Sequence, residues 1–126
     1  MSQLERPWGG AAKIYTKKRR LYDELTDRKN SKKLPRLMDT FHVAAALGIR
    51  LNRADLLAEG PREELINVYT VDSEGVLWLL MSSLYPDASG QERFEKLVAH
   101  AEYGVERLAE EYRTFGSIQS ALDRLL

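Results

Sequence analysis

One continuous apolar stripe near the C-terminus constrains the fold of this chain more than any other feature. Seven apolar residues recur at the spacing of one helix face over about five turns: Phe94, Leu97, Val98, Ala101, Val105, Leu108 and Tyr112. Ser89 and Glu92 precede the stripe with the spacing of a capping box, and Gly116 follows it as a natural stop. The pattern predicts a long helix near residues 90–113 whose apolar side must be covered by other elements.

Helical signals also occur earlier in the chain. We expect a first helix from Thr16, a suitable N-cap, to about Lys29. A second helix should begin near Pro35 and stop at Gly48. Its alanine-rich stretch at 43–47 would let another helix approach closely, or would offer a docking surface to a larger partner.

The segment between the second helix and the long helix is strongly apolar. We expect a third helix, capped by Asp72 or Ser73 and ending near Tyr85, to be the central buried one because it is apolar nearly all round. Residues 66–71 alternate as a strand does, but extended loop and helix stay open because no partner strand is evident. A short amphipathic helix is expected over 117–126.

These elements predict an all-α fold: a single-domain helical bundle of four to six helices. Residues 1–12 contain a proline and two glycines and are expected to form a flexible N-terminal arm, with the helical domain spanning 13–126. Residues 49–64 are expected to be irregular, with a turn at Gly60-Pro61.

The net charge of zero conceals a division of charge along the chain. Residues 1–36 hold 11 Lys and Arg against 4 acidic residues, a net +7, whereas residues 37–126 hold 8 against 15, a net −7. Such asymmetry points to a polyanionic partner or to a complementary surface within the chain.

The basic segment conflicts with local helix stability. Lys17, Lys18, Arg19 and Arg20 fall in the expected first turn, where cations oppose the helix dipole. Because these cations do not stabilise the helix, the conflict indicates that they serve in binding. Nine cations are therefore candidate contacts for nucleic acid or an acidic partner: Lys17, Lys18, Arg19, Arg20, Arg28, Lys29, Lys32, Lys33 and Arg36. The alternatives are a solvated face, or a face paired with the acidic part of the same chain.

A second candidate surface lies on the long helix. Glu102, Glu106 and Glu110 are spaced four apart and are expected to form an acidic stripe. The stripe is either a solvated face or a protein-docking surface for a basic partner.

Motifs for catalysis and cofactor binding are missing from the sequence. The chain has no cysteine, which excludes disulfides, thiolate catalysis and cysteine-based zinc sites. His42 and His100 lie on separate expected helices without metal-ligand spacing, and there is no glycine-rich phosphate loop or nucleophile-elbow motif. We therefore expect no catalytic, cofactor or metal site. A signal peptide and a bilayer-spanning apolar run are also missing, so a cytoplasmic location is expected.

Three stretches of the chain resemble a known family. They are Ile14-Tyr15 followed by LYDEL at 21–25, FHVAAALGIR at 41–50, and HAEYGVERL at 100–108. Together they resemble the small Dnd system-associated proteins, found near gene clusters for DNA phosphorothioation. The third stretch departs from the family's E-x-Y-A-N-G-G-L wording, keeping the tyrosine and one glycine.

The resemblance implies a cytoplasmic, prokaryotic protein that acts beside DNA-modification or restriction machinery in anti-phage defence. It transfers no catalytic residue. The leading hypothesis is a non-enzymatic accessory or interaction subunit bound to a larger protein of a defence complex. The alternative is a small DNA-binding protein that uses the basic N-terminal helix.

Overall fold

The computed structural model describes residues 7–10, 12–55 and 61–126, which form a mainly helical fold with one small sheet. Its elements follow in chain order as β1 (Lys13–Thr16), α1 (Arg19–Leu25), α2 (Leu37–Arg50), β2 (Glu63–Asn67), α3 (Val68–Val71), α4 (Val76–Leu84), α5 (Gly90–Phe115) and α6 (Ile118–Leu125). The mainly helical prediction is confirmed, but the fold is not purely all-α because β1 and β2 pair.

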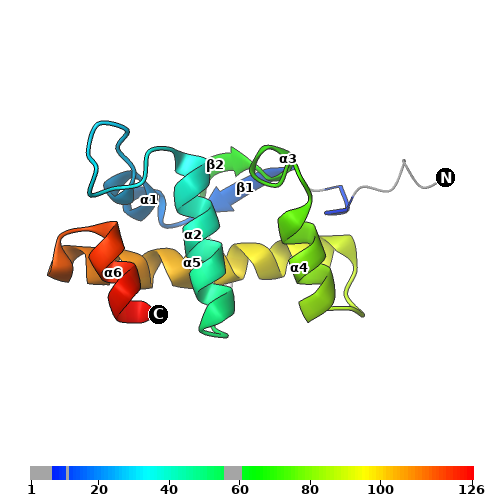
Figure 1. Cartoon of the computed structure of the whole chain (residues 1–126). Helices are drawn as coiled ribbons and strands as arrows, with labels where there is room; N and C mark the ends of the chain where they lie inside the picture. The colour runs from blue at the N-terminus through cyan, green and yellow to red at the C-terminus, as the bar shows by residue number, and fades with distance from the viewer. Residues whose placement is uncertain (1–6, 11, 56–60) are drawn as a thin grey trace.

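The long helix α5 spans the width of the molecule, and α1, α2, α4, α6 and β1 pack along it (Figure 1). Its capping box is present in full, with Ser89 accepting from the Glu92 amide and Glu92 accepting from the Ser89 amide. Gly116 ends the helix in the left-handed conformation, with φ of 83°. The predicted position and boundaries of this helix are therefore confirmed to within two residues.

Helix α2 crosses α5 at the centre of the molecule (Figure 1). Glycines permit the contact: a β-carbon at Gly104 of α5 would lie 1.8 Å from the carbonyl oxygen of Ala44, and one at Gly48 of α2 would lie 2.0 Å from that of His100. The prediction that Gly48 stops the helix is wrong, because α2 continues to Arg50. The alanine-rich stretch thus packs largely within the chain, with Ala44 and Ala45 fully buried.

The predicted first helix is replaced at its start by a strand. Strand β1 ends at Thr16 and pairs antiparallel with β2, from Lys13 opposite Asn67 to Thr16 opposite Glu63. Thr16 is therefore not an N-cap, and α1 is a short helix of seven residues. A strand signal was missed here because a four-residue strand is too short to show a clear period.

Residues 66–71, for which the sequence allowed a strand, an extended loop or a helix, belong to two elements. Ile66 and Asn67 end β2, whereas α3 begins at Val68 with the Asn67 side chain accepting from the Tyr69 amide. The predicted boundaries of the irregular segment 49–64 are wrong at both ends, because α2 continues to residue 50 and β2 begins at residue 63. The expected Gly60-Pro61 turn lies partly outside the described residues.

Helix α4 does not occupy the centre of the fold. It lies beside the N-terminal part of α5 (Figure 1). Its side chains Leu77 and Met81 are buried, while its remaining leucines are exposed. The prediction of a central buried helix is wrong, because a helix that is apolar on every side need not be buried on every side. The N-cap is Gly75 and not Asp72 or Ser73, but the Asp72 carboxylate still accepts from two first-turn amides, those of Leu77 at 2.8 Å and Trp78 at 3.0 Å.

One residue near the N-terminus, Trp8, belongs to the core, whereas Pro7 and Gly10 are exposed. Trp8 is only 1% exposed and packs in the same apolar cluster as α2 and α5. The expected arm at 1–12 thus contains one residue that is fixed in the core, while residues 1–6 and 11 lie outside the described part. Within the described ranges, no helix has the length and apolarity needed to cross a membrane.

Candidate functional site

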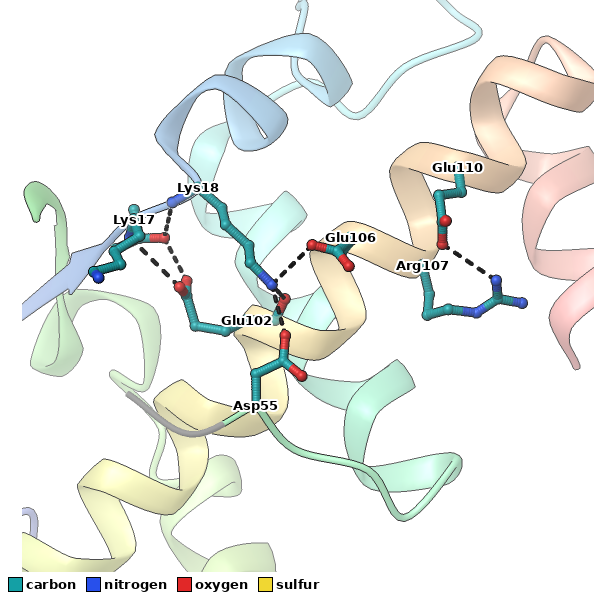
Figure 2. A network of polar contacts seen from close by, with 8 residues as sticks. Lys17, Lys18, Asp55, Glu102, Glu106, Arg107 and Glu110 are labelled. Atoms are coloured by element: carbon teal, nitrogen blue, oxygen red, sulfur yellow. Dashed lines mark hydrogen bonds and ion pairs between the residues drawn. The ribbon is translucent and has the colours of Figure 1, made fainter. Parts of the chain in front are cut away.

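Lys18 lies at the centre of a network of charged groups between β1, α5 and the segment after α2 (Figure 2). Its Nζ lies 2.6 Å from Asp55 Oδ2 and 3.1 Å from Glu106 Oε1. It also donates to the main-chain carbonyl of Glu102 at 2.9 Å. Three donors on one ammonium are thus matched by three acceptors.

Glu102 occupies the buried end of this network. Its side chain accepts hydrogen bonds from the Thr16 hydroxyl and, at 3.4 Å, from the Lys17 amide, and the residue is only 5% exposed. Burial raises the pKa of Glu102 above its ordinary value of 4.5, although these hydrogen bonds and the charge of Lys18 oppose the shift.

The pKa of Lys18 reflects the same competition. Burial alone would lower it, but hydrogen bonds and ion pairs with Asp55 and Glu106 outweigh burial and raise the pKa above 10.5. Lys18 therefore stays charged at neutral pH. A lysine that is protonated at neutral pH is a poor general base.

The two interaction surfaces expected from the sequence thus meet each other. Lys18 from the basic segment binds Glu106 from the acidic stripe, and Glu102 is buried beneath them. The expectation of a solvent-facing stripe is wrong for Glu102. Glu106 and Glu110 stay exposed, but Glu110 pairs with Arg107 at 3.2 Å. One alternative left open by the sequence, pairing within the chain, therefore accounts for part of both surfaces.

Several other basic candidates also have partners in the chain. Arg19 pairs with Asp23 at 3.1 Å, and Arg36 pairs with Asp39 at 3.0 Å. Lys33 lies 5.8 Å from the centroid of the Tyr112 ring. Lys17 also has contacts of its own. The other four of the nine candidates are exposed: Arg20, Arg28, Lys29 and Lys32.

Both histidines have hydrogen-bonded structural positions. His100 is 3% exposed, with Nδ1 2.6 Å from the carbonyl of Arg53 and Nε2 2.8 Å from the Tyr85 hydroxyl. The Nε2 atom of His42 lies 2.6 Å from the carbonyl of Val71. In the described ranges, no three His, Asp or Glu side chains are grouped to hold a metal ion.

The structure also contains a polar cavity, open to solvent, that the sequence did not predict. It has a volume of about 440 Å³ and is lined by Leu51, Arg53, Tyr103, Arg107, Arg124 and Leu125. These residues come from the segment just after α2, the middle of α5 and the end of α6. Because these residues are far apart along the chain, they form no local motif that could be recognised in the sequence.

A scan against protein-family models and searches of curated proteins and solved structures found no match for this chain.

Proposed function

We propose that this chain is a non-enzymatic accessory subunit that docks on a larger protein of a prokaryotic DNA-modification or restriction system, in the cytoplasm. The outer face of α4 is the observation that carries the docking role. The association with anti-phage defence and with DNA phosphorothioation rests on the three sequence stretches that resemble the Dnd-associated family.

The outer face of α4 is apolar and lacks a covering element among the described residues. Val76 and Leu79 are each 62% exposed, Leu84 is 45% exposed and Leu80 is 38% exposed. No charged side chain occurs in the sequence from residue 75 to residue 86. Contiguous exposed apolar side chains of this kind mark protein-binding surfaces more often than ordinary solvated ones.

The charged groups around this face support the choice of a basic partner surface. Glu74 and Asp87 are exposed at its two ends. The nearby Arg93 guanidinium donates instead to the carbonyls of Tyr85 and Pro86, which end the helix. An apolar helix of the partner protein with basic residues flanking its contact face is therefore the complementary occupant.

Affinity purification from the native host tests the proposal, with nuclease-treated and untreated halves compared. Leu79→Glu should abolish recovery of a protein partner that survives nuclease, because it places a charge in the apolar contact. Phe115→Glu is the matched control, since Phe115 is 46% exposed at the far end of α5.

Two outcomes would contradict this assignment. Partner recovery that survives Leu79→Glu would remove α4 as the docking face. A dimer of this chain alone, dissociated by the same substitution, would assign the face to a second copy. Light scattering on the purified protein separates this second outcome from the proposed one.

DNA binding by the basic segment stays the alternative function. Arg28, Lys29 and Lys32 favour it, because they are exposed and have no acidic partner among the described residues. Binding through them should weaken steeply with salt. Duplex affinity that is unchanged after Arg28, Lys29 and Lys32 are replaced by Gln would count against it.

A further inference from the structure

We infer that the cavity lined by Arg53, Arg107 and Arg124 binds the phosphate of a nucleotide, either free or within a single strand of nucleic acid. This site is separate from the α4 face, because it lies between the ends of α2 and α6 beside the middle of α5 (Figure 1). The inference does not depend on the docking role.

The lining of the cavity defines the charge of its ligand. Three of its six lining residues are arginines and none is acidic. Arg107 is held by Glu110 and Glu111, each at 3.2 Å. Arg53 and Arg124, by contrast, have no carboxylate partner among the described residues. Two uncompensated guanidinium groups in one cavity favour an oxyanion, and their planar forks suit phosphate.

The remaining lining residues define the body of the ligand. Tyr103 is partly buried, and the guanidinium carbon of Arg53 lies 6.0 Å from the centroid of its ring. Leu51 and Leu125 complete the lining with apolar surface. A ligand that carries both an anionic group and a flat or apolar body matches this combination, and bases bind to tyrosine and arginine faces in this way. The volume of about 440 Å³ lies in the range of small-molecule sites.

A purely structural role explains only part of the arrangement. Arg124 lies in the last turn of α6, where a cation interacts favourably with the helix dipole, whereas Arg53 lies three residues beyond the end of α2 at Arg50. The dipole therefore accounts for Arg124 alone. It does not account for the convergence of both with Arg107 around one cavity.

Fluorescence anisotropy with a labelled single-stranded DNA of about 12 nucleotides tests the inference. The double substitution Arg53→Gln and Arg124→Gln should reduce affinity at least about tenfold and reduce the salt slope by about 1.4, because two phosphate contacts are lost. Both side chains belong to exposed residues, so the variant should fold normally, and circular dichroism checks this.

The double substitution Arg28→Gln and Lys29→Gln is the matched control, since it removes two exposed charges outside the cavity. Its affinity should stay within about twofold of the unmodified protein. Equal losses in both variants would indicate general electrostatic attraction and would overturn the inference. A loss confined to the control would assign binding to the basic segment and would also overturn the inference. The inference is likewise overturned if the unmodified protein binds none of the probes.

Competition distinguishes the two sources of the phosphate. Displacement of the strand by adenosine monophosphate, but not by inorganic phosphate, identifies a single nucleotide as sufficient. If adenosine monophosphate does not displace the single-stranded DNA, yet the cavity variant no longer binds that DNA, the site binds the phosphodiester backbone of a strand.

Discussion

The carbonyl oxygen of Ala44 lies against the α-carbon of Gly104 where α2 crosses α5, and a β-carbon at Gly104 would sit 1.8 Å from it. Gly104→Ala should therefore force the two helices apart. Because the obstacle is main chain and not a flexible side chain, we expect the free energy of unfolding to fall by at least about 2 kcal/mol. Urea denaturation measures this change.

Gly10→Ala provides the control for this crossing, since a β-carbon there meets nothing within 4 Å. The free energy of unfolding of that variant should change by less than about 0.5 kcal/mol. Equal stability of the two variants would show that the helices do not approach this closely.

The charged network gives a second prediction. Lys18→Met should lower the free energy of unfolding by about 1–2 kcal/mol, because it leaves Asp55 and Glu106 without their counter-charge. The expected loss is below that of a fully buried pair, since the side chains of Asp55 and Glu106 are 41% and 56% exposed. Lys29→Met, at an exposed position, should have little effect in the same urea titration.

The sequence allowed prediction of elements whose signals are local. The capping box, the apolar stripe and Gly116 placed α5 correctly because each signal acts within a few residues. The alanine-rich stretch likewise indicated a close helix contact, which is the crossing of α2 with α5. Strand β1 could not be predicted for two reasons: its four residues are too few to show a period, and its partner lies about 50 residues further along the chain.

The candidate sites depended on tertiary contacts and were harder to predict. Glu102, Glu106 and Glu110 share one helix edge in sequence, but the packing of β1 covers Glu102 alone. Composition identified α4 as apolar without showing which side faces outward. The arginine cavity is assembled from three elements, so no periodicity in the sequence could reveal it.

The buried carboxyl group of Glu102 should make stability depend on pH. Because burial raises its pKa in the folded state, the folded protein holds this proton more tightly than the unfolded chain. Its contribution to stability is full below the ordinary pKa and is lost as pH rises through the raised value. Glu102→Gln does not ionise, so its stability relative to the unmodified protein should increase from acidic to neutral pH.

Urea denaturation at several pH values measures that difference. Glu95→Gln is the control, because it removes one carboxylate from an exposed position of the same helix. A difference between Glu102→Gln and the unmodified protein that stays constant or shrinks toward neutral pH would contradict the assigned environment of Glu102.

The cap of α4 connects local stability with the docking surface. Asp72→Ala removes the acceptor for the amides of Leu77 and Trp78 and should lower the free energy of unfolding by about 1–2 kcal/mol. Because the cap acts on the first turn, hydrogen exchange should accelerate at the α4 amides before those of α5. Asp87→Ala, at an exposed position after the same helix, should leave exchange in α4 unchanged. Uniform acceleration across α4 and α5 in Asp72→Ala would instead show that α4 unfolds only with the whole domain, and that its outward face has no local freedom to adjust to a partner.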